Sequence, residues 1–66
     1  MEEIIKVLEA LGGKATSEEL MEELAPKYGV VKARLMISEA VRKGIIKKVP
    51  DYELRKEVFV LQKPNI

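Results

Sequence analysis

The stretch GIIKKVPDYELRKEVFVL, residues Gly44–Leu61, contains two short apolar runs on either side of a charged tip. The runs IIKKV (45–49) and VFVL (58–61) are rich in β-branched and aromatic side chains and are bounded by prolines, which is typical of two strands that pair as a hairpin. The connection of eight residues, Pro50–Glu57, is longer than a tight turn. We therefore predict strands over about 45–49 and 57–62, joined by a long polar tip.

The residues before this hairpin follow the period of an α-helix. A helix is predicted over about 31–43, after the turn residue Gly29, and Gly44 ends it behind two basic residues in the last turn. The apolar residues that we expect on its buried face are Ala33, Met36, Ile37, Ala40 and Val41.

Two more helices are predicted in the N-terminal half. Residues 2–11 repeat apolar side chains at the intervals of one helical face, and Gly12-Gly13 ends that helix. The run Thr16–Glu19 matches a capping box, so a second helix begins there and covers about 17–28. Residues 14–16, between the two helices, are predicted to form a very short extra strand.

Size and composition exclude most enzymatic chemistry. The 66 residues form a single domain, 1–66, whose core is too small for a deep substrate cleft. The chain has no Cys and no His, which excludes disulfides, thiol or imidazole catalysis and the usual zinc sites. We predict no enzyme activity, no catalytic residue, no metal and no cofactor. No signal peptide is visible and no apolar run approaches the ~18 residues of a membrane span, so a cytoplasmic location without membrane contact is expected.

Charge separates along the chain. Residues 1–26 carry two Lys and seven Glu, a net charge of −5, whereas residues 27–66 carry ten Lys or Arg and four Asp or Glu, a net charge of +6. A basic half is typical of proteins with an anionic partner, although charged side chains also simply solvate a fold. The content of 35% charged residues, mostly Lys and Glu, is also typical of thermophile proteins.

The order helix, helix, turn, helix, hairpin resembles the winged helix-turn-helix domain, an α+β fold of three helices followed by a two-stranded wing. The wing is similar to that of MarR-type transcription regulators, and the matching motifs, in the same order and spacing, are KGII (43–46), Pro50-Asp51, Arg55-Lys56 and Val58–Val60. The resemblance implies that helix 31–43 is a recognition helix, that Arg55 at the wing tip enters a minor groove, and that Asp51 helps to orient it.

The residues of helix 31–43 favour contact with DNA independently of this resemblance. Arg34, Ser38 and Arg42 recur every four residues and form one outward stripe. Arg pairs bidentately with guanine, Ser bonds a base or a phosphate, and Lys32 adds a phosphate contact near the helix start. The preferred interpretation of Leu35 is that it closes the core, and the alternative is that it contacts a thymine methyl group.

These patterns predict a double-stranded DNA-binding protein, a small transcription regulator whose third helix enters the major groove while its wing tip contacts the minor groove or phosphates. The residues expected to contact DNA are Lys32, Arg34, Ser38, Arg42, Lys47, Lys48, Arg55 and Lys56. The alternative is a winged-helix module that binds other proteins within a larger nucleic-acid-processing or other assembly. Apolar side chains on both faces of the hairpin leave two uses for its outer face, contact with a partner protein or formation of a homodimer.

Overall fold

The computed structural model of the chain describes residues 2–62. Its elements are α1 (Glu2–Ala10), β1 (Lys14–Ala15), α2 (Ser17–Tyr28), α3 (Val30–Arg42), β2 (Ile46–Asp51) and β3 (Lys56–Leu61). Three helices followed by a two-stranded hairpin are the predicted α+β winged helix-turn-helix arrangement, and the short strand near 14–16 is present. Each element ends within two residues of its predicted limit.

The helix-turn-helix consists of α2, α3 and the single residue Gly29 between them. The capping box is confirmed: the Thr16 hydroxyl accepts a hydrogen bond from the Glu19 amide at 3.1 Å, and the Glu19 carboxylate accepts one from the Thr16 amide at 2.9 Å. Helix α2 continues through Pro26 to Tyr28. Gly29 then adopts φ +84° and ψ 160°, a region essentially open to glycine alone, so the chain turns between two helices within one residue.

The three strands form one antiparallel sheet in the order β1-β3-β2. Its register pairs Asp51 with Lys56 at the end of the hairpin. The strands therefore extend closer to the tip than predicted, and the connection is the four-residue loop 52–55. Pro50 fits within β2 because β2 is an edge strand, which has hydrogen-bond partners on one side only.

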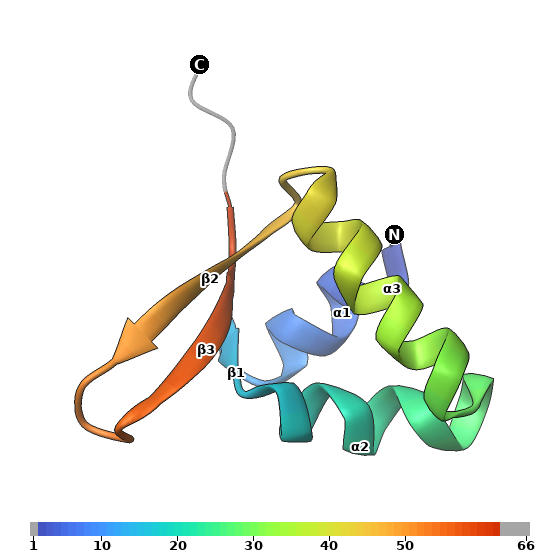
Figure 1. Cartoon of the computed structure of the whole chain (residues 1–66), viewed down its shortest axis with the longest axis horizontal. Coiled ribbons are helices and arrows are strands. Elements are labelled where there is room, and N and C mark those ends of the chain that lie inside the picture. The colour runs from blue at the N-terminus through green and yellow to red at the C-terminus, as the bar shows by residue number, and fades with distance from the viewer. Residues whose placement is uncertain (1, 63–66) are drawn as a thin grey trace.

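One face of the sheet packs on the helices. Side chains alternate between two faces along a strand, and residues paired across strands share a face. Ala15, Ile46 and Phe59 are buried in the same cluster as the helices, so they define the core face. The helical residues of this cluster are Ile4, Val7, Leu8, Leu20, Leu24, Ala33, Ile37 and Ala40. Figure 1 shows the hairpin projecting to one side of the three helices.

Two apolar side chains of α3 lie outside the core, contrary to prediction. The helical period places Val41 on the buried face, but this residue is 39% exposed. Leu35 is 63% exposed, so the interpretation that it closes the core is wrong. The reason is geometric, because the buried side of α3 runs through Ala33, Ile37 and Ala40, and Leu35 projects from the opposite side.

The outer face of the sheet carries Val49, Val58 and Val60. Val58 is 1% exposed and lies outside the main cluster, and its two neighbours are half-buried. This face therefore offers less exposed apolar surface to a protein partner or a second copy than the hairpin sequence indicates.

Candidate nucleic-acid interface

The outward side of α3 mixes polar and apolar side chains. All the contact residues predicted on this helix are exposed, namely Lys32, Arg34, Ser38 and Arg42. They are joined by large exposed apolar residues: Val30 at 53%, Val31 at 74% and Leu35 at 63%. The surface of α3 is therefore less polar than the predicted stripe of Arg, Ser and Arg.

Arg42 is held by its own helix. Its Nε donates a hydrogen bond to the Glu39 carboxylate at 3.2 Å, a terminal guanidinium nitrogen forms an ion pair with the same carboxylate, and Lys43 Nζ lies 4.0 Å from it. The hydrogen bond from Arg42 lowers the pKa of Glu39 below its ordinary value, so this carboxylate is charged at neutral pH. To contact a phosphate or a base, Arg42 must therefore release the Glu39 carboxylate.

The start of α3 combines a cation with backbone donors. Lys32 Nζ lies 5.2 Å from the centre of the Tyr28 ring, a cation–π contact that holds the ammonium beside the corner between α2 and α3. Gly29 precedes α3 and has no side chain to accept hydrogen bonds from the first-turn amides. The first turn of α3 thus presents positive charge and N–H groups together, an environment that favours an anion.

Arg34 and Ser38 line a groove between α2 and α3. The opposite wall of this groove belongs to α2 and carries Glu18 and Glu22, and Phe59 of β3 contributes to its lining. The two walls therefore have opposite charge. Because a polyanion is repelled by the glutamates, it is expected against the outer edge of α3 rather than inside the groove.

The structure separates Lys47 from its neighbour Lys48. Lys48 pairs with Phe59 on the core face of the sheet, where its Nζ lies 5.7 Å from the ring centre and 4.0 Å from a Glu57 carboxylate oxygen. Lys47 and Lys56 belong to the outer face by the same register. The predicted contact residues of the wing therefore lie on two faces and not on one continuous surface.

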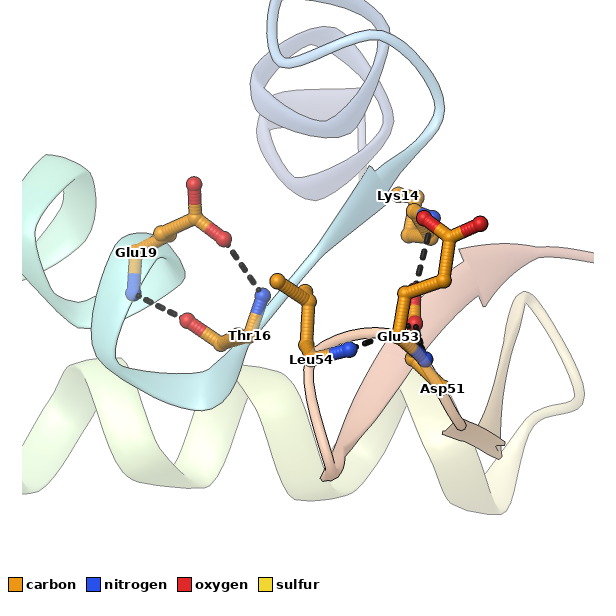
Figure 2. A network of polar contacts seen from close by, with 6 residues as sticks. All are labelled: Lys14, Thr16, Glu19, Asp51, Glu53 and Leu54. Carbon is orange, nitrogen blue, oxygen red and sulfur yellow. Dashed lines mark hydrogen bonds and ion pairs between the residues drawn. The ribbon is translucent and has the colours of Figure 1, made fainter.

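The wing tip is shaped by the carboxylate of Asp51 (Figure 2). One oxygen accepts hydrogen bonds from the amides of Glu53 and Leu54 at 3.0 and 3.1 Å, and the other binds Lys14 Nζ at 2.7 Å. The hydrogen bond from Lys14 is the largest cause that lowers the pKa of Asp51, and it raises the pKa of Lys14 in turn. This carboxylate binds Lys14 and the backbone of the loop that ends at Arg55, and the expectation that Asp51 helps to orient Arg55 stays a prediction.

The ion pair between Lys14 and Asp51 crosses the sheet. Lys14 is in register with Val60 of β3, and Asp51 is in register with Lys56. Val58 lies midway between these two levels on the same face of the sheet and is 1% exposed. The contact ties the wing to β1 across the outer face of the sheet.

Arg55 is the last residue of the loop and has φ +54°, in the left-handed region. A side chain with a Cβ is disfavoured there by about 1–2 kcal/mol, whereas glycine is not. Arg55 is exposed, and so are Tyr52 at 86% and Leu54 at 52% in the same loop. The backbone conformation of the loop therefore does not account for an arginine at this position.

Sequence reasoning missed Lys14 and Val31. Lys14 binds Asp51, which is 37 residues away in the sequence, and no local sequence pattern predicts that contact. The signal for Val31 was present, because Val31, Leu35 and Arg42 follow one another at intervals of four and seven, the spacing of one line along a helix. This line, opposite the buried side, is the outermost part of α3.

Comparison with known proteins found no relative: no family model, curated protein or solved structure matches the chain. The likeness of the wing to that of MarR-type regulators therefore stays a prediction. Within residues 2–62, no helix combines the length and the apolarity needed to cross a membrane. The case for a function rests on the geometry and charge of α3 and the wing.

Proposed function

We propose that the chain binds double-stranded DNA and acts as a small transcription regulator in the cytoplasm, with α3 in the major groove and the wing on the minor groove or phosphates. The observation that carries this proposal is the separation of charge over the fold. The exposed side of α2 carries Glu18, Glu19, Glu22 and Glu23, whereas most of the exposed cations of residues 2–62 lie on α3 and the wing. Duplex DNA is a polyanion whose major groove admits one α-helix.

The arrangement of the wing lysines supports the same proposal. Lys48 lies on the core face of the sheet, and Lys47 and Lys56 lie on the outer face. A groove of DNA has phosphates along both walls, so a ribbon with cations on both faces is suited to lie between them. Arg55, at the end of the hairpin, is then the deepest cation of the wing.

The salt dependence of binding to a duplex tests this proposal. We expect the logarithm of the association constant to fall linearly with the logarithm of salt concentration, with a slope of about −0.9 for each phosphate contact. Fluorescence anisotropy with a labelled 20-base-pair duplex, about twice the 10-base-pair helical turn, measures this slope. Weak binding that does not change with salt would contradict the proposal.

Arg55→Gly separates the binding role of Arg55 from its folding role. Glycine accepts φ +54°, so we expect the variant to be more stable than the native chain by up to about 1 kcal/mol. The lost charge should weaken duplex binding at least about threefold and reduce the salt slope by about one contact. Glu23→Gln on α2 is the control and should not weaken binding. Unchanged affinity of Arg55→Gly would remove the wing tip from the interface.

The second candidate function is docking to a protein, and one observation favours it. Tyr52 and Leu54 expose apolar surface at the end of the projecting hairpin, where a partner protein reaches them easily. Tyr52→Ser together with Leu54→Ser should then abolish capture of a defined partner from native lysate while duplex affinity is retained. Loss of duplex affinity without a captured partner would reject the docking function.

A further inference from the structure

The outermost line of α3 begins with two apolar side chains. Val31 is 74% exposed and Leu35 is 63% exposed, one turn further along the same line. Single exposed apolar residues are normal on protein surfaces. Val31 and Leu35, however, lie on successive turns, on the part of α3 that would lie deepest in a major groove. Their exposure therefore calls for a functional explanation.

We propose, resting on the proposed DNA binding, that Val31 and Leu35 determine sequence specificity by contacting the C5 methyl groups of thymines. The major-groove edges of the bases present hydrogen-bond donors and acceptors, and the thymine methyl is the apolar group among them. Apolar side chains at the centre of a recognition surface are complementary to the thymine methyl group, and guanine and cytosine present no such group in the major groove. The sites bound by this protein are therefore distinguished by thymines.

The surroundings of the two residues favour DNA over an apolar protein partner. Lys32 follows Val31, and Arg34 precedes Leu35, so cations lie on both sides of the line. Ser38 and Arg34 also separate this line from Val30, which lines the groove beside α2. Protein interfaces gather apolar residues at a core depleted of charge, whereas here the apolar and basic side chains alternate. In a major groove, the thymine methyl groups would meet the apolar side chains, and the phosphates on either side would meet the basic side chains.

The spacing of the two residues limits the positions of the thymines. Four residues advance about 6 Å along a helix, and successive base pairs are separated by about 3.4 Å. Val31 and Leu35 therefore reach methyl groups about two base pairs apart when α3 follows the groove.

Replacement of thymine by deoxyuridine tests the inference, because this change removes the methyl group and keeps the base pairing and the phosphates. The probe is the tightest-binding duplex selected from a random pool, compared with the same duplex made with deoxyuridine throughout. We expect about fourfold weaker binding for each methyl contacted, the effect of exposing one methyl-sized apolar group, with an unchanged salt slope.

Leu35→Ala assigns that difference to α3. The variant should bind the thymine duplex about fourfold more weakly than the native chain does and should lose most of its preference over deoxyuridine at the base that Leu35 contacts. Leu54→Ala is the matched control: it truncates a leucine of similar exposure on the wing and should keep the full preference.

The possible failures are distinguishable. Salt-dependent binding with equal affinity for the two duplexes overturns this inference and leaves the proposed function intact. A preference for thymine that survives Leu35→Ala and Val31→Ala also overturns it, since the methyl groups are then read elsewhere. Absence of salt-dependent binding to both duplexes overturns the proposed function and this inference with it.

Discussion

Helices α2 and α3 have 12 and 13 residues, but their surfaces differ in kind. The surface of α2 is explained by folding, because its capping box bonds the backbone donors of the first turn and Glu18 and Glu19 suit the positive end of the helix dipole. Helix α3 has no side-chain cap, no acidic residue in its first turn, and Val31 and Leu35 exposed to solvent. Folding does not require this second surface, which supports the proposal that α3 is the element that contacts DNA.

The largest expected effect is the difference in stability between two leucine-to-alanine variants, one in α2 and one in α3. Leu24→Ala removes a fully buried side chain of α2, and we expect the free energy of unfolding to fall by about 2–5 kcal/mol. Leu35→Ala removes an exposed side chain of α3 and should change it by less than about 0.5 kcal/mol. Urea denaturation followed by circular dichroism measures both. Similar losses in the two variants would mean that Leu35 packs as Leu24 does, and the contrast between the helices would fail.

The helix starts provide a smaller effect. Thr16→Ala removes the hydroxyl that accepts the Glu19 amide hydrogen bond, and we expect a loss of about 1 kcal/mol in the free energy of unfolding. Thr16→Ser keeps a hydroxyl at the same position and serves as the control. Thermal melts of the two variants and the native chain measure the difference. If the alanine and serine variants had the same melting temperature, the capping box would contribute nothing to the stability of α2.

The smallest expected effect concerns the ion pair that ties the wing to β1. The folded chain has a lowered pKa at Asp51 and a raised pKa at Lys14. The stability contributed by Asp51 is therefore present above its ordinary pKa of 3.8 and is lost as the pH falls through the lower folded value. The contribution of Lys14 is present below 10.5 and is lost as the pH rises through the higher folded value.

Asp51→Asn tests this pH dependence. The melting temperature of the native chain should fall more steeply than that of Asp51→Asn as the pH is lowered from about 5 to about 2, because the stability contributed by Asp51 is lost only below its ordinary pKa of 3.8. Glu53→Gln, a change at an exposed carboxylate of the same loop, should follow the native curve more closely. Parallel curves for the native chain and Asp51→Asn would show that the contact with Lys14 does not stabilise the fold.

Most of the fold was predictable because its determinants are local. The capping box, the glycines and the apolar periods locate the helices, and β-branched residues locate the strands, in each case within two residues. The prediction failed where the wing shortens from an eight-residue connection to a four-residue loop, because Asp51 and Lys56 pair across the hairpin. Pairing between strands depends on contacts that composition does not contain.

The candidate site was predicted less completely. The sequence identified the exposed cations of α3 and the wing, but not that Glu39 holds Arg42, nor that Lys47 and Lys48 lie on opposite faces. Alternation along a strand separates such neighbours, yet which face is buried depends on where the helices pack. The exposure of Leu35 was likewise decided by the position of the core.

By itself the sequence determined the identity and order of the elements and the sign of the charge that each carries, because periodicity, capping and composition act over a few residues. The tertiary structure alone decided which residues meet. Lys14 binds Asp51 across 37 residues, Val58 is buried although it lies on the outer face of the sheet, and the line through Val31 and Leu35 is the outermost part of α3. The physical reason is that packing fixes the register and rotation of each element, and these set which side chains remain exposed to bind a partner.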